Sequence, residues 1–343
     1  METVAQSGVS ARQAPAQKKT FVQNRSIGHE ARTNRWGYVF VAPFLIAFAF
    51  FNLWPTINTF VLSFTDLKGL RNDYNFTGFV NFSRLVNDPY FWGALKNTFI
   101  IWGFNFVPQL GIALVLAIWL SDARLNLAGK GLFRAVVYMP NLLTMASVAL
   151  LFRSLFGYPV GPANQILRLL DIQSVSIIDG VQVKEAFNFF RSVPFTRMLV
   201  AFIQWWMWYG HTLIMLMAGI TSIPVSLYES ATVDGANGRQ TSWYITLPLL
   251  RPMMLYILVT SMIGGMQMFD IPFLLTDRFG GPDNKIRTTV LYQYNVAFGS
   301  ARDQSYGAAI SIGIFIVTIF LAMLIFFFLQ DRSDLKKKKG GGA

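Results

Sequence analysis

Six uncharged intervals of 18 residues or more divide this chain of 343 residues, counting histidine as neutral. Each interval is long enough for a helix of about 20 residues, which crosses the hydrocarbon core of a bilayer. These uninterrupted apolar runs also lack the alternation of apolar and polar residues that a strand of a membrane β-barrel shows. The sequence therefore predicts an all-α membrane protein with six transmembrane helices. We expect these spans at about residues 37–64, 98–121, 133–156, 198–223, 250–270 and 305–330.

The overall composition agrees with a membrane protein and argues against several kinds of site. Hydrophobic residues make up 53% of the chain and charged residues only 13%, whereas a soluble domain has roughly 25% charged residues. The chain has no cysteine and two histidines, which excludes disulfides and thiolate metal sites. The predicted spans hold essentially no ionisable side chain besides His211. We therefore expect no metal site, no intramembrane catalytic cluster and no proton coupling.

Basic residues at both ends of the chain set the expected topology. Lysines and arginines precede the first span, and Lys336–Lys339 follow the last one. By the positive-inside rule, both termini are predicted to be cytoplasmic. Residues 1–35 are predicted to form a disordered tail and residues 331–343 a basic tail. The net charge of +12 is then mostly a membrane-side bias, so no nucleic-acid partner is expected.

A polar segment, "ESATVDGANGRQTSWYITLPLLRP" at residues 229–252, separates the fourth and fifth spans. The predicted topology places it in the cytoplasm. Its pattern suits a short helix, a turn at Asp234–Gly235 and a second helix. Two interpretations remain open from these features: a docking element for a cytoplasmic partner, or a plain connecting loop.

The spacing within this segment resembles that of a known transporter family. Glu229-Ser230-Ala231, Gly235 and Ile245–Pro248 match the EAA loop of ABC-importer permeases, with Ser230 in place of the usual alanine. The stretches "FRAVVYMPNLL", "GPANQIL" and "FDIPFLLTDRFGGPDNKIRTTVLYQYNVAF" resemble the carbohydrate branch of that family, the maltose and glycerol-phosphate type. The likeness runs from about Trp36 to Gln330.

The resemblance implies the type I ABC importer permease fold over residues 36–330. In this family the loop, here residues 224–249, forms a coupling helix seated in a cleft of the ATPase. The resemblance implies that Glu229 makes an ionic contact with the ATPase and that Gly235 allows the turn. It implies packing roles for Ala231 and Leu247. The implied coupling residues are Glu229, Ser230, Ala231, Asp234, Gly235, Ala236, Ile245, Leu247 and Pro248.

The resemblance also implies the partners and the location. The partners are an ABC ATPase dimer, an extracytoplasmic solute-binding protein, a sugar, the lipid bilayer and a second permease subunit, as a heterodimer or alternatively a homodimer. ATP and Mg²⁺ bind the ATPase, so this chain itself holds no cofactor. The sequence agrees, because neither "GANGRQTS" nor "AGKG" has the Walker A spacing. We expect a multi-pass protein of a bacterial or archaeal cell inner membrane that works by alternating access.

Neutral polar and aromatic residues within the spans suggest a substrate path. A sugar presents hydroxyls at its edge and CH groups on its ring face, which suits such side chains. Alternatively, the aromatic residues form interfacial belts and the amides join helices. Gln109, Trp208 and His211 also lie in these spans. We expect His211 to be a packing residue rather than a substrate contact. The candidate path residues are Asn105, Asn141, Gln204, Trp205, Tyr209, Gln267 and Asp270.

Other functions remain as alternatives. Within the family, the solute could be a polyol phosphate or an amino acid. Outside it, a stand-alone facilitator or channel would have no use for an inward helical hairpin. A membrane-embedded enzyme or receptor is disfavoured because this sequence lacks catalytic clusters. Small residues about one turn apart in the last span, from Gly307 to Gly313, would allow close contact with a helix of a partner subunit, although such spacing also arises by chance.

Overall fold

The structure is a computed structural model that describes residues 27–69, 73–121, 129–178 and 181–329. The chain divides into two compact units, Met1–Ile57 and Asn58–Ala343. The predicted tail at residues 331–343 lies outside the described residues, as do residues 1–26 of the predicted amino-terminal tail. Residues 27–35 of that tail instead belong to a helix.

The first unit is helical throughout its described part. Helix α1 (Ile27–Phe48) contains Pro43 and continues through the π turn η1 (Ala49–Leu53) into α2 (Trp54–Leu62), within which the unit ends. Pro55 lacks the N–H of a regular helix, and the π turn ends two residues before it. The segment Gly37–Leu62 is long and apolar enough to cross a membrane, and its side chains are almost all exposed. Such a helix suits contact with lipid.

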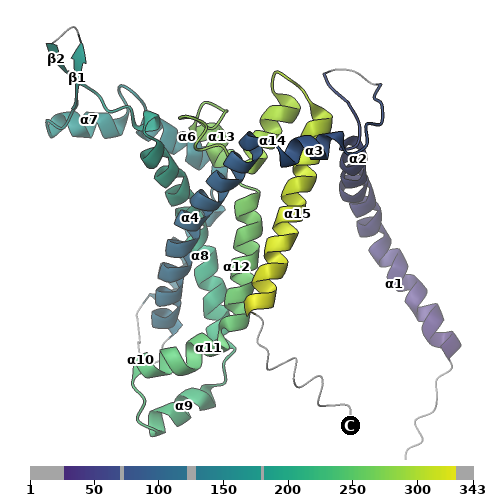
Figure 1. Cartoon of the computed structure of the whole chain (residues 1–343). Coiled ribbons are helices and arrows are strands. Elements are labelled where there is room, and N and C mark those ends of the chain that lie inside the picture. Colours follow the sequence, from purple (N-terminus) through teal and green to yellow (C-terminus); the bar gives the residue numbers. More distant parts are fainter. Residues whose placement is uncertain (1–26, 70–72, 122–128, 179–180, 330–343) are drawn as a thin grey trace, which may run out of the picture. The chain divides into compact units, whose positions relative to one another are not determined.

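The second unit is a helical bundle (Figure 1). Its long helices are α4 (Pro89–Ser121), α8 (Val193–Thr221), α12 (Arg251–Met266) and α15 (Gln304–Leu329). In the described part of the whole chain, four segments are long and apolar enough to span a bilayer, and the number rises to six if each of two bent helix pairs counts as one span.

The predicted span at residues 133–156 is broken. Helix α5 (Lys130–Tyr138) and the 3₁₀ turn η2 (Met139–Leu142) are followed by α6 (Met145–Leu155), and the pair bends by 87°. Pro140 lies in the 3₁₀ turn, and Thr144 begins the next helix by accepting a hydrogen bond from the Ser147 N–H. Because proline cannot donate the helical hydrogen bond, the chain turns here. Pro108, by contrast, lies inside the continuous α4.

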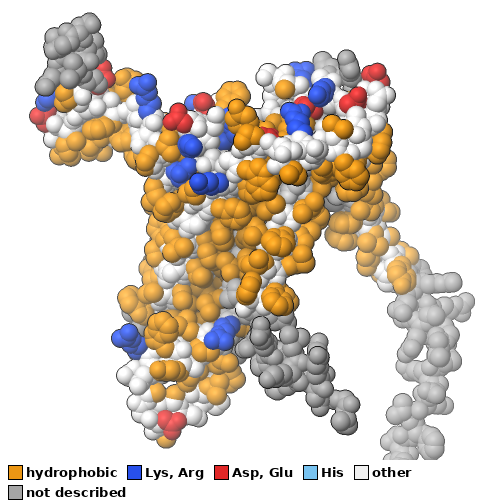
Figure 2. Space-filling view, viewed as in Figure 1, with side chains coloured by type: hydrophobic (Ala, Val, Ile, Leu, Met, Phe, Trp, Pro, Cys, Tyr) orange, Lys and Arg blue, Asp and Glu red, His pale blue; other side chains and the backbone are white. Residues whose placement is uncertain are grey.

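Shorter elements gather at the two ends of the bundle (Figure 1). One end carries α3 (Val80–Val86), α7 (Pro162–Leu169), the antiparallel pair β1 (Ser174–Ile178) and β2 (Val181–Glu185), η3 (Phe189–Arg191), α13 (Asp270–Leu275) and α14 (Thr289–Phe298). The opposite end carries α9 (Val225–Val233), α10 (Gly238–Thr241), η4 (Ser242–Thr246) and α11 (Leu247–Leu249). Figure 2 shows apolar side chains over the middle of the bundle and charged ones toward these ends. This is the distribution that a bilayer requires.

Helices α4 and α8 pack closely and run in the same direction. Arg197 of α8 donates to Asn97 of α4 at 3.0 Å, and twelve residues farther along α4, Gln109 donates to Thr212 of α8 at 2.7 Å. Fully buried Ile101, Ile203 and Leu213 fill the space around this pair. The parallel pair with α12 beside it forms the frame of the site described below.

The small residues of α15 serve packing within the chain. A Cβ at Gly307 would lie 2.6 Å from the Ala297 Cβ of α14, and one at Gly313 would lie 2.6 Å from the Leu85 Cδ2 of α3. Both distances are shorter than any normal carbon contact. The close approach predicted for a partner subunit is therefore made, at these two glycines, to helices of the same chain.

Asp88 joins three elements at the end of the bundle that holds α14. Its carboxylate accepts hydrogen bonds from the hydroxyls of Tyr292 (2.6 Å) and Tyr306 (2.5 Å). Burial alone would raise the pKa of Asp88, but these two bonds and those from the N–H groups of Tyr90 and Phe91 hold it below its usual value. A carboxylate with a lowered pKa stabilises the fold above its unfolded-state pKa, and the contribution is lost as the pH falls through the lowered value.

We expect Asp88→Asn to lower the free energy of unfolding by about 1.5–3 kcal/mol at neutral pH, the usual contribution of hydrogen bonds to a charged group. Thermal melting of the detergent-solubilised chain between pH 7 and pH 3 measures this difference. The advantage of the wild type over the variant should persist down to the usual aspartate pKa of about 3.9 and begin to decline below it. Asp171→Asn is the control, because Asp171 forms an exposed pair with Lys184 that contributes little. Equal melting temperatures of the wild type and both variants at pH 7 would contradict a structural role for Asp88.

Candidate functional site

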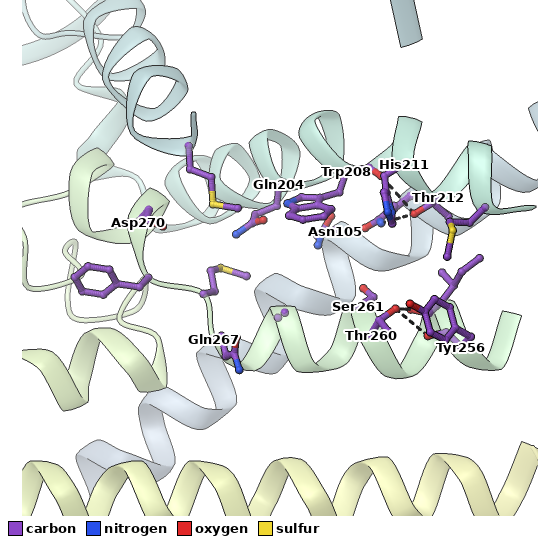
Figure 3. A pocket seen from close by; sticks show the side chains of 18 residues that line it. Asn105, Gln204, Trp208, His211, Thr212, Tyr256, Thr260, Ser261, Gln267 and Asp270 are labelled. Carbon is purple, nitrogen blue, oxygen red and sulfur yellow. Dashed lines mark hydrogen bonds between the residues drawn. The ribbon is translucent and has the colours of Figure 1, made fainter. Parts of the chain in front are cut away.

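A cavity of about 350 Å³ lies between α4, α8 and α12, with α6 and α13 at one end (Figure 3). Polar side chains of three helices point into it. Asn105 comes from α4, Gln204 and Trp208 from α8, and Thr260 from α12. The packed core around α4 and α8 holds these helices together beside the cavity.

Several polar groups in the cavity already bond to one another. Gln109 donates to the Thr212 hydroxyl at 2.7 Å, and the Ser261 hydroxyl accepts from the Trp102 indole at 3.2 Å. The Asn105 side chain differs, because its Oδ1 is buried and has no hydrogen-bond partner. A buried, unpaired acceptor is unfavourable until a donor reaches it. Asn105 lines the cavity, but surrounding protein atoms cover this oxygen.

The charge of the lining is low. Of the described residues that line the cavity, Asp270 at the start of α13 carries the only carboxylate, and none is Lys or Arg. His211 lies edge-on to the Trp208 ring, with centroids 5.9 Å apart. Neutral hydrogen-bonding groups beside an aromatic face suit an uncharged polyhydroxylated molecule better than an anion.

The structure brings four of the seven predicted path residues together. Asn105, Gln204, Gln267 and Asp270 line the cavity, as do Gln109, Trp208 and His211. Three others lie elsewhere. Asn141 donates to the Met207 carbonyl at 3.3 Å and so joins two helices, and Tyr209 packs in the apolar core. Trp205 lies among Phe202 and Tyr209 with its indole N–H buried and unpaired.

Sequence reasoning missed the contribution of α12. Tyr256, Thr260, Ser261 and Gly264 all line the cavity. Residues 256, 260, 264 and 267 are three or four apart, so they share one face of the helix. This spacing of polar and small residues in an otherwise apolar span is a signal from which the stripe could have been found.

The second part of the site is residues 224–249, which the sequence predicts to couple to an ATPase and which we therefore call the coupling segment. Helix α8 ends at Thr221, and α9 follows after a 70° bend next to Pro224. At the end of α9 the Ala236 N–H donates back to the Ala231 carbonyl at 2.9 Å, and Gly235 has a φ of +78°. This is the glycine-terminated helix end that favours residues without a Cβ. The turn predicted at Asp234–Gly235 is therefore present, and the positive φ of Gly235 explains why a glycine occupies it.

The rest of the coupling segment is held by local bonds. Asn237 and Gln240 form a reciprocal capping box at the start of α10. The Tyr228 and Thr246 hydroxyls lie 3.2 Å apart and connect α9 with η4. Two helical arms joined in this way form a stiff element.

The predicted coupling residues differ in exposure. Ala231 is buried and Ile245, Leu247 and Ala236 are half-buried, whereas the others are exposed: Glu229, Ser230, Asp234, Gly235 and Pro248. Apolar residues that the sequence did not single out are also exposed, including Val233 (88%), Tyr244 (79%) and Trp243 (61%). Apolar side chains exposed on an otherwise polar segment favour a surface for another protein.

Among the described residues, no group of three or more His, Asp or Glu side chains is placed to hold a metal ion. What the arrangement offers is a neutral polar cavity inside the bundle and a stiff, partly apolar element at one end of it.

Comparison with known proteins gives one consistent result. Residues 109–337 match the family model described as binding-protein-dependent transport system inner membrane component. The lactose transport system permease protein LacF of Rhizobium radiobacter is 31% identical over 296 residues, which are 86% of this chain and 94% of LacF. The arabinooligosaccharides transport system permease protein AraP of Bacillus subtilis (strain 168) is 32% identical over 290 residues, 84% of this chain and 86% of AraP.

A solved structure agrees at the level of the fold. The crystal structure of a bacterial ABC transporter involved in the import of the acidic polysaccharide alginate contains a chain that matches with a TM-score of 0.70 and 22% identity. The match covers 89% of this chain and 98% of that one.

Proposed function

Because the chain belongs to the family of binding-protein-dependent transport system inner membrane components, we propose that it forms half of the translocation path of an ATP-driven importer for a sugar or oligosaccharide. The chain is a multi-pass permease subunit of the cell membrane, and its family is one of transporter components rather than enzymes. The sugar class is suggested by the relatives' names and by the neutral cavity.

The proposed assembly has four kinds of component. The chain would cross the membrane six times with both termini in the cytoplasm, in line with its long apolar helices and bent pairs. It would pair with a second permease, receive solute from a solute-binding protein, and dock an ABC ATPase dimer that binds ATP and Mg²⁺. One crystal structure similar to this chain (TM-score 0.67) is described as a complex with an alginate pentasaccharide-bound periplasmic protein, which supports the binding-protein partner.

The single observation that carries the sugar proposal is the lining of the central cavity. The side chains of Asn105, Gln204 and Gln267 could exchange hydrogen bonds with a sugar, and the face of Trp208 could contact its ring. The absence of Lys and Arg from this lining disfavours a phosphorylated solute. Alternating access would open the cavity to one side and then to the other as the helices rock.

Stiffness is the property that the proposed coupling requires. ATP-driven closure of the ATPase would move the coupling segment as a rigid body, because its capping box and the Tyr228–Thr246 contact hold it together. The bend beside Pro224 links that movement to α8, which lines the cavity.

The test is to fill the cavity. No atom lies within 4 Å of a Cβ built at Gly264, which lines the cavity, so Gly264→Leu can enter it without a clash. We expect import of labelled sugar by the complete transporter in proteoliposomes to fall at least about tenfold, since a single misplaced group in a site can have an effect of about 100-fold. The ATPase should remain bound.

The matched control is Gly103→Leu, because Gly103 of α4 has equally open surroundings and does not line the cavity. The solute for the assay is found by screening sugars against the cognate binding protein. Unchanged import by Gly264→Leu would show that the cavity is not on the path.

A further inference from the structure

A second concavity, which we call the basic cleft, lies at the amino ends of α4 and α8. It has a volume of about 540 Å³ and is lined by the first turns of both helices and by the loop before α14. Four cationic side chains face it, with Asp283 as the single carboxylate: Lys96, Arg197, Lys285 and Arg287. The cleft is therefore strongly positive, unlike the central cavity.

These charges are not neutralised within the described part of the chain. None of the four cations has a carboxylate within salt-bridge distance there. Arg197 donates through Nη2 to Asn97 and to the Lys285 carbonyl (2.8 Å), but its Nε is buried without a hydrogen-bond partner. Burial also lowers the pKa of Arg287, against the opposing effect of Asp277 and two tyrosines. An anion in the cleft would offset the unpaired positive charge of these side chains.

The loop that supplies Lys285 and Arg287 to the basic cleft is held by specific backbone contacts. Gly280 of the "GGP" turn has a φ of +84°, and a Cβ there would lie 2.4 Å from the Arg287 Cα. The Asp277 carboxylate accepts hydrogen bonds from the N–H groups of Phe279 and Gly281, each at 3.0 Å. Because α4 and α8 are parallel, the positive ends of two long helix dipoles also point to this end.

An apolar face continues from the basic cleft along α4. Gly93 and Ile100 line the cleft, and Phe104 and Val107 share their helix face by spacing. Phe104 is 52% and Val107 71% exposed, and Tyr90 and Trp92 are exposed in the first turn. Aromatic residues at the start of a span mark the membrane–water interface. A ligand that fits this arrangement has an anionic head and apolar chains.

From these observations we propose that the basic cleft binds the phosphodiester headgroup of an anionic phospholipid, whose acyl chains lie along Phe104 and Val107. The positive charge selects the headgroup, and the exposed face of α4 favours a lipid over a free anion. This site is separate from the central cavity and the coupling segment, so the proposal does not depend on which solute is carried.

The experiment counts lipids retained by the purified full transporter complex in native mass spectrometry, with phosphatidylglycerol or phosphatidylcholine added. We expect a preference for phosphatidylglycerol. Two variants should remove it by different means. Lys96→Gln with Arg197→Gln removes charge and should weaken binding roughly 30-fold, the attraction usual for two basic residues near an anionic surface. Gly93→Leu keeps every charge but fills the cleft, because no atom lies within 4 Å of a Cβ at that position.

Arg168→Gln is the control, since Arg168 is an exposed cation of α7 that does not line the cleft, and it should keep the preference. Thermal melting verifies that each variant is folded. Equal binding of the two lipids by the wild type, or an unchanged preference in Gly93→Leu, would overturn the proposal. Displacement of phosphatidylglycerol by millimolar inorganic phosphate would also overturn it, because the occupant would then be a soluble anion.

Discussion

Val233→Asp should release the ATPase from the purified complex and abolish sugar import, while the permease itself remains in the membrane. Val233 is the last residue of α9 and is 88% exposed. We expect this side chain to pack into the ATPase that we propose docks on the coupling segment. Its burial would contribute about 1.5–3 kcal/mol, and an aspartate would in addition have to lose its water. Together these effects weaken docking by at least about 100-fold. Co-purification of the ATPase and import in proteoliposomes measure the two results.

Two further variants separate apolar docking from ionic docking. Val233→Ile keeps the apolar contact and should retain the ATPase. Glu229→Gln removes the proposed ionic contact, and because exposed ion pairs contribute only about 0–1 kcal/mol, its effect should be less than about fivefold. If Glu229→Gln releases the ATPase as completely as Val233→Asp, the docking is mainly ionic and the role assigned to Val233 is wrong.

Gly210→Val should prevent the bundle from reaching its native packing. A Cβ at Gly210 would lie 2.3 Å from the Val137 carbonyl oxygen and 2.9 Å from the Tyr138 Cα. Both are backbone atoms, so no side chain can move aside, and α8 must separate from α5. Overpacking of this kind typically costs about 1–3 kcal/mol and more when backbone must shift. We expect little folded protein in size-exclusion chromatography and no import.

Gly111→Val is the matched control for this prediction. Gly111 also lies within a long helix, α4, but no atom lies within 4 Å of a Cβ built there. The same change of residue should therefore leave the amount of folded protein nearly unchanged. A normal yield of folded Gly210→Val would mean that α5 and α8 can separate without loss, contrary to the close packing in the structure.

The sequence itself determined the class of the protein and the helix–turn–helix form of residues 224–249. Long uncharged intervals force helices in a bilayer, because lipid offers no partner for backbone groups. The position of Gly235 was equally readable, since a helix end with positive φ favours glycine. These features are local, and composition or spacing along the chain encodes them directly.

Tertiary structure decided the rest. Asn105, Gln204 and Gln267 line one cavity while Trp205 and Tyr209 do not, because the face a residue presents depends on how its helix packs against its neighbours. The basic cleft joins Lys96, Arg197 and Arg287 from three parts of the chain. Gly307 and Gly313 pack against helices of their own chain, which no spacing rule specifies. Residue type thus fixed which chemistry was present, and helix packing fixed which groups meet, because contacts between distant segments are set by the whole core.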